Sequence, residues 1–157
     1  MRGQIRIGIF QLRVGEDKEE NLSKVKDLVK KERLEADLLV FPEYLMADIT
    51  YLSPEEVYEL SESLNGSWVK FFRELSKEYS AYILTTLFER TRSPPKVRNT
   101  AVLISPEGEV IAAYRKIHLF DALDGKESNY MIPGSEPSPI SDVKGVKVAM
   151  AVCFDPG

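Results

Sequence analysis

The sequence predicts an α/β fold, because strand-like and helix-like segments alternate along the chain. Residues 5–12 hold a short apolar run typical of a strand, and residues 17–35 repeat apolar side chains at helical spacing. Residues 37–41, DLLVF, form an almost continuous apolar run, which is typical of a strand buried on both faces. Strand, helix and strand in this order indicate a sheet covered by helices.

Two further helices follow. Ser53 opens the first, since Pro54 occupies the first helical position and Glu56 completes a capping box. The second begins near Ser67. Its apolar side chains recur on one side, so we expect them to pack in the core: Trp68, Phe71, Phe72, Leu75 and Tyr79.

The second half of the chain predicts more strands. Residues 81–88 are rich in β-branched and aromatic side chains, and residues 99–105 and 109–114 flank a hairpin turn at Pro106-Glu107-Gly108. Regular periodicity is absent from residues 115–145, and a loop of this length inside a compact domain is usually functional or disordered. Residues 146–152, VKVAMAV, predict a last strand that ends directly at Cys153.

Composition narrows the class of protein. The 157 residues fit one domain, and a net charge of -4 without a long basic run argues against nucleic-acid or anionic-membrane partners. No apolar stretch approaches the roughly 18 residues of a membrane span. The start of the chain does not resemble a signal peptide, and the single cysteine excludes an internal disulfide, so we expect a cytoplasmic protein. With one histidine, His118, and no second histidine or cysteine nearby, we expect no metal site.

Three chemically capable side chains follow predicted strands: Glu43, Lys116 and Cys153. Binding crevices in open α/β sheets form at the carboxyl ends of strands. A thiol can be activated by a nearby ammonium or by a carboxylate that accepts its proton. A fixed cation can then stabilise the charge that develops on an attacked amide or nitrile. These three side chains are a sufficient set for covalent cleavage of a carbon–nitrogen bond, although spacing alone does not bring them together.

Each candidate has a simpler interpretation. Cys153 at the end of an apolar strand is typical of a packed core residue, since free cysteines are often buried. Glu43 alone would be a solvated loop carboxylate, and Lys116 beside Arg115 would be a surface charge. A redox-sensing thiol is a further alternative, which the absence of a second, resolving cysteine disfavours.

Longer motifs resolve this choice. DLLVFPE (residues 37–43), NTAVLISPEGEVIAAYRKIHLFD (residues 99–121) and VAMAVCFD (residues 148–155) resemble the nitrilase superfamily of carbon–nitrogen hydrolases. Smaller matches are Gln11, Asn21, Pro133-Gly134 and Glu127.

The resemblance implies an αββα sandwich that uses no cofactor and forms homodimers or larger homo-oligomers. It implies that Cys153 forms a thioester with a small amide or carbamoyl substrate and that Glu43 acts as general base and then as general acid. Lys116 and the backbone N–H of Phe154 would hold the oxyanion. Glu127 would position Lys116 or the substrate. Tyr44, Tyr130 and Met131 are further pocket candidates, chosen only by proximity to the motifs.

Members of the family continue well beyond the nucleophile, whereas this sequence ends four residues after Cys153 with Pro156-Gly157. We therefore expect residues 1–157 to be the N-terminal portion of a single hydrolase domain, truncated after the nucleophile strand. We expect such a portion to be unstable or inactive unless another chain covers it. The alternative function is that of an inactive family member acting only as a binding or assembly module.

Overall fold

A computed structural model describes residues 3–32, 35–122 and 126–155. Within these ranges the predicted helices are confirmed as α1 (Lys18–Glu32), α2 (Pro54–Leu60) and α3 (Ser67–Tyr79). The last residues of the predicted 17–35 helix include positions 33–34, which lie outside the described ranges, as do Pro156 and Gly157. The capping box of α2 forms as predicted, with Ser53 Oγ accepting from Glu56 N–H and Glu56 accepting from Ser53 N–H.

The predicted strands are present with different lengths. They are β1 (Ile7–Ile9), β2 (Leu38–Val40), β3 (Tyr82–Arg90), β4 (Val97–Ile104), β5 (Val110–Arg115) and β7 (Val146–Val148). The prediction of one strand over residues 146–152 is wrong. Only Val146–Val148 have ladder partners among the described residues, because their neighbour β6 (Ser141–Val143) is itself three residues long.

Strand β6 lies inside the segment predicted to be a loop. It joins β7 through Lys144 and Gly145, whose φ angles are 50° and 82°. Positive φ at both central residues is the requirement of the tight hairpin turn that suits twisted strands. In the sequence this turn is marked by the pair Lys144-Gly145. Such a pair predicts a hairpin less strongly than the Asn-Gly or Asp-Gly pairs that usually mark such turns.

The main sheet has five strands in the order β1-β2-β3-β4-β5. Strands β1, β2 and β3 are parallel, whereas β4 is antiparallel to β3 and β5 is antiparallel to β4. Strand β5 therefore runs in the same direction as β2. The carboxyl ends of β2 and β5 and the amino end of β4 consequently meet at one edge of the sheet.

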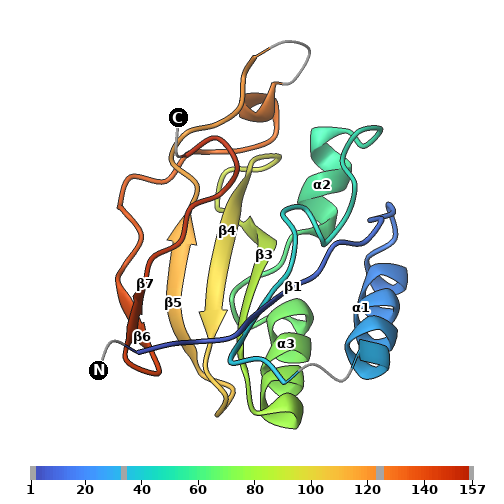
Figure 1. Ribbon diagram of the computed structural model, residues 1–157. Helices are drawn as coiled ribbons and strands as arrows, with labels where there is room; N and C mark the ends of the chain where they lie inside the picture. Colours follow the sequence, from blue (N-terminus) through green and yellow to red (C-terminus); the bar gives the residue numbers. More distant parts are fainter. Residues whose placement is uncertain (1–2, 33–34, 123–125, 156–157) are drawn as a thin grey trace.

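The two faces of this sheet are covered by different elements. On one face, Leu39, Ile83 and Val102 join the helix side chains in a large apolar core that includes Trp68 and Phe72. On the other face, a smaller cluster joins sheet residues to the segment around the β6–β7 hairpin: Leu38, Ala101, Leu103, Ala112, Tyr114, Val143, Met150 and Val152. Figure 1 shows the helices on one side of the sheet and the hairpin on the other.

The predicted stripe of α3 is part of the core, and Trp68 is fully buried with its indole N–H donating to Thr86 O at 2.9 Å. Within the described residues, no helix combines the length and the apolar character needed to cross a lipid bilayer.

Candidate active site

The ammonium of Lys116 lies between two carboxylates. Its Nζ atom is 3.1 Å from Glu43 Oε1 and 2.9 Å from Glu127 Oε2. Glu43 is the third residue after β2 and Lys116 follows β5 directly, so the sheet topology described above brings them to the same edge. The structure therefore joins three of the residues that the sequence singled out.

Burial makes this cluster unlike a surface ion pair. The side chains of Lys116 and Glu127 are only 1% and 4% exposed, and that of Glu43 is 24% exposed. Burial by itself would lower the pKa of Lys116, but the hydrogen bond from Lys116 to Glu127 and the charge of Glu43 outweigh it and raise the pKa. Lys116 is therefore a permanent cation at neutral pH, and the interpretation of Lys116 as a surface charge is wrong.

Neighbouring groups fix the two carboxylates. Asn99, near the start of β4, donates from Nδ2 to Glu43 Oε1 at 2.7 Å. Glu127 accepts from the hydroxyl of Tyr44 and from the backbone N–H of Phe120, both at 2.7 Å. Glu43 is consequently a bonded, oriented group, and its interpretation as a solvated loop carboxylate is wrong.

The long segment that carries Glu127 is anchored to the sheet. Val97 N donates to Tyr130 O and Ile132 N donates to Val97 O, both at 2.9 Å, so the segment pairs with the start of β4. Gly134 then passes so close to β5 that an added Cβ would lie 2.2 Å from Arg115 O. A glycine at this position lets the segment return beside the strand that delivers Lys116.

Cys153 is exposed, so its interpretation as a core residue is wrong. Its φ angle is 46°, in the left-handed region that residues other than glycine rarely adopt. Such backbone strain is held by surrounding contacts and is common at functional sites. The turn is closed by a backbone hydrogen bond from Asp155 N to Val152 O at 3.1 Å.

Asp155 connects this turn to the segment after Lys116. One carboxylate oxygen accepts from the N–H groups of Ile117 and His118 at 3.1 and 2.9 Å, and the other accepts from Val152 N–H at 2.9 Å. Burial opposes ionisation of Asp155, but the backbone donors of His118 and Val152 outweigh it and lower the pKa of this carboxyl. A charged Asp155 therefore fixes the nucleophile candidate relative to the lysine.

The thiol of Cys153 resists ionisation. Although the residue is exposed, partial desolvation of its sulfur raises the pKa, the negative charge of Glu43 raises it further, and the positive charge of Lys116 only partly opposes these effects. The thiol therefore stays protonated at neutral pH. It requires a proton acceptor when it attacks, and Glu43 is the carboxylate that its surroundings provide.

A cavity of about 340 Å³ collects these groups. It is lined by Glu43, Lys116, Glu127 and Cys153 together with Tyr44, Ile49, Thr50, Phe120, Lys126 and Tyr130. Tyr44 and Tyr130 thus line the cavity, whereas the pocket candidate Met131 is 2% exposed and belongs to the apolar core. No residue in the described ranges accepts a hydrogen bond from the N–H of Phe154.

Two positioning residues were missed by the sequence analysis: Asn99 and Asp155. Each lies inside a motif that resembles the family, since Asn99 opens the motif of residues 99–121 and Asp155 ends the motif of residues 148–155. The motif signal was therefore available, but the bonding partners of both residues are distant in sequence. Among the described residues, no group of three His, Cys, Asp or Glu side chains is arranged to hold a metal ion.

Comparison with known proteins identifies relatives of this chain. The carbon–nitrogen hydrolase family profile matches residues 6–157. Deaminated glutathione amidase of Bos taurus is 34% identical over 160 residues, covering 95% of this chain and 48% of the bovine protein. Citrullinase of Francisella tularensis is 25% identical over 156 residues, covering 96% of this chain and 53% of that protein.

A solved structure supports the fold. The carbon–nitrogen hydrolase of Helicobacter pylori superimposes with a TM-score of 0.82 and 22% identity, covering 96% of this chain and 52% of that one. The predicted fold class, that of the nitrilase type, is thereby confirmed. The chain spans about half the length of the curated relatives that it matches. On the profile match and the bovine relative, the chain belongs to the carbon–nitrogen hydrolase family.

Proposed function

We propose that the protein hydrolyses a small amide or carbamoyl compound through a thioester on Cys153. The observation that carries this proposal is the buried Glu43–Lys116–Glu127 cluster in the same cavity as an exposed, conformationally strained cysteine. The names of the relatives, an amidase and a citrullinase, support the class of substrate. The nitrile-cleaving alternative is less favoured by these names.

In the first half-reaction Glu43 takes the thiol proton while the sulfur of Cys153 attacks the carbonyl carbon. The carbonyl π pair moves onto oxygen, and the resulting oxyanion is stabilised by Lys116 and the N–H of Phe154. When the carbon–nitrogen bond breaks, Glu43 returns its proton to the leaving nitrogen. Ammonia or an amine departs, and an acyl group remains on Cys153.

In the second half-reaction Glu43 accepts a proton from water, and the hydroxide attacks the thioester. The oxyanion that forms in this step is again stabilised by Lys116 and the N–H of Phe154. Its collapse expels the thiolate, which regains the proton held by Glu43, and a carboxylic acid is released. The same carboxylate therefore acts as base and acid in both halves, which fits its partly exposed position beside Lys116 in the lining of the cavity.

Glu127 has a positioning role in this proposal. It is almost fully buried and is saturated by Lys116, Tyr44 and the Phe120 N–H, so it holds the ammonium in place while Glu43 moves protons. Because Glu127 contacts Lys116 independently of Glu43, the ammonium keeps a partner when Glu43 becomes protonated.

The experiment is to incubate the protein with small amides, carbamoyl compounds and nitriles and to measure ammonia release and the mass of the intact chain. We expect ammonia from at least one amide or carbamoyl compound and a transient acyl adduct that maps to Cys153. Cys153→Ala should abolish both. An adduct-free protein that releases no ammonia from any compound would favour the alternative of an inactive binding or assembly module.

A homodimer or larger assembly, a cytoplasmic location and the need for a covering chain remain predictions. Sedimentation of the protein at several concentrations tests the first and last of these. A monomer that unfolds cooperatively and shows full activity would contradict them.

A further inference from the structure

Four arginines line a second cavity of about 360 Å³ at the same edge of the sheet: Arg90, Arg92, Arg98 and Arg115. Glu89 is the one carboxylate among the lining residues. This concentration of positive charge is unexpected in a chain whose net charge is -4. The proposed hydrolysis uses none of these arginines.

Two of the four guanidinium groups are held rigidly. Arg115 donates to Glu89 from Nε at 2.7 Å and from Nη2 at 2.6 Å. Arg90 donates to the last carbonyls of α2, Tyr58 O and Glu59 O, at 3.2 and 3.1 Å and packs over the Tyr58 ring. Both side chains are therefore preorganised and need little further ordering to contact a ligand.

The other two arginines are available. Arg92 is exposed and Arg98 is half-buried, and neither forms an ion pair within the part of the chain that the structure describes. Glu89 supplies a single negative charge against the four guanidinium groups, and it already accepts from Arg115 and from the hydroxyl of Thr100 at 2.8 Å. The cavity thus has unbalanced positive charge, with forked donors whose geometry matches phosphate and carboxylate oxygens.

The cavity lies on the opposite side of the strands from the reaction site. On β4, Asn99 donates to Glu43, while its neighbour Thr100 donates to Glu89. At the end of β5, Lys116 contacts Glu43, while its neighbour Arg115 contacts Glu89. Alternate residues of the same two strands therefore serve two separate cavities.

We propose that this arginine cavity binds a small phosphate-bearing anion at a site distinct from the reaction cavity. Its volume is within the roughly 300–1,000 Å³ of pockets that hold small ligands. Phosphate is favoured over a single carboxylate because it carries more oxygens and more negative charge for the guanidinium groups that line the cavity.

The test is calorimetric titration of the protein with inorganic pyrophosphate in metal-free buffer at low ionic strength. We expect saturable binding at one site that is independent of Cys153. The double variant R92Q/R98Q should weaken binding about tenfold or more, because it removes two charge-assisted donors without disturbing the bonds of Arg90 or Arg115. The matched control is K30Q/K70Q, which removes the same charge from exposed helix positions and should leave the affinity unchanged.

Three outcomes would overturn the proposal. They are no saturable binding of pyrophosphate, equal weakening by the control variant, and binding of citrate more tightly than pyrophosphate. Equal weakening would mean attraction to net charge alone, and tighter citrate binding would mean a carboxylate site. Because Cys153→Ala should bind pyrophosphate like the unaltered protein, failure here is separable from failure of the proposed hydrolysis.

Discussion

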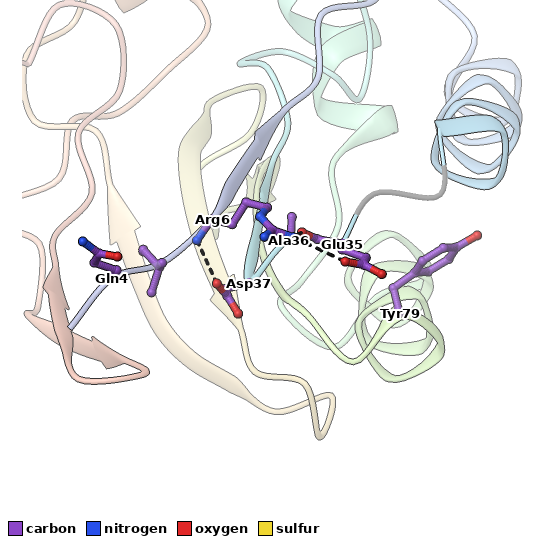
Figure 2. A pocket seen from close by; sticks show the side chains of 7 residues that line it. Gln4, Arg6, Glu35, Ala36, Asp37 and Tyr79 are labelled. Carbon is purple, nitrogen blue, oxygen red and sulfur yellow. Dashed lines mark hydrogen bonds and ion pairs between the residues drawn. The ribbon is translucent and has the colours of Figure 1, made fainter.

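Charged side chains gather at both ends of the parallel strands, and the two groups differ in burial. At the carboxyl ends, Lys116 lies between Glu43 and Glu127 in a cavity of about 340 Å³. At the amino ends, Arg6 lies beside Glu35 and Asp37 in a larger cavity of about 740 Å³, shown in Figure 2. Cavity size alone would therefore select the wrong end of the sheet.

The difference is one of solvation. The side chains of Arg6 and Glu35 are 70% and 93% exposed, so water screens their interaction. Asp37 accepts from the Arg6 backbone N–H and forms an ion pair with Lys144. It thereby links the residues that precede β1 and β2. Lys116 and Glu127 are shielded from water, where charges act strongly on each other and on a reacting group. Similar residue types thus serve as a surface ion pair at one end and as a candidate catalytic cluster at the other.

The largest expected effect separates the two ends by activity. Glu43→Gln keeps the shape of the side chain but cannot accept a proton, so we expect kcat to fall by about 10²- to 10⁴-fold. The matched change at the other end, Asp37→Asn, should leave kcat within about twofold of the unaltered protein. Steady-state rates of ammonia release measure both. Comparable losses in the two variants would contradict the assignment of the site.

Stability should separate the ends in the same way. Lys116→Met leaves two carboxylates in the buried cluster without their cation, and we expect a loss of about 3–5 kcal/mol in the free energy of unfolding. Arg6→Met removes an exposed cation and should leave the denaturation midpoint close to that of the unaltered protein. Urea denaturation followed by circular dichroism measures both.

A rescue variant sharpens the stability comparison. Adding Glu43→Gln and Glu127→Gln to Lys116→Met removes the unpaired charges, so most of the lost stability should return. If the triple variant were as unstable as Lys116→Met, the loss would come from packing of the lysine stem and not from its charge.

A smaller effect is expected from the group that fixes the cysteine turn. Asp155→Asn keeps one oxygen that can accept from Ile117, His118 or Val152 but loses the negative charge, so we expect a loss of about 1.5–3 kcal/mol in the free energy of unfolding. We expect kcat to fall with little change in KM, because Asp155 is not among the residues that line the reaction cavity. A lower melting temperature together with an unchanged kcat would show that the role of Asp155 is purely structural.

The smallest effect concerns the ionisation of the thiol. Because Glu43 raises the pKa of Cys153 and Lys116 lowers it, Glu43→Gln should shift the alkylation profile with iodoacetamide to lower pH. Lys116→Met should shift it to higher pH. Asp37→Asn should not move it. Identical profiles in all of these proteins would mean that neither charge acts on the sulfur.

Much of the fold could be predicted because its signals are local. The capping box at Ser53 and the apolar stripe from Trp68 define two helices within a few residues of chain. The last strand could not be predicted correctly, because the length of β7 depends on how many residues of β6 pair with it. Apolar residues 149–152 look like strand in the sequence, but Met150 and Val152 pack against the sheet face without continuing the ladder.

The sequence by itself determined the types of chemical group and their order: a carboxylate after β2, an ammonium after β5 and a thiol after the last apolar run. Motif strings also determined the family, because they carry residues that each local pattern leaves unexplained. Only the tertiary structure decided that Lys116 is buried, that Asn99 and Asp155 orient its neighbours and that Arg6 at the other end is not equivalent. Burial and hydrogen bonding between residues distant in the chain depend on strand order and register, which no local pattern specifies.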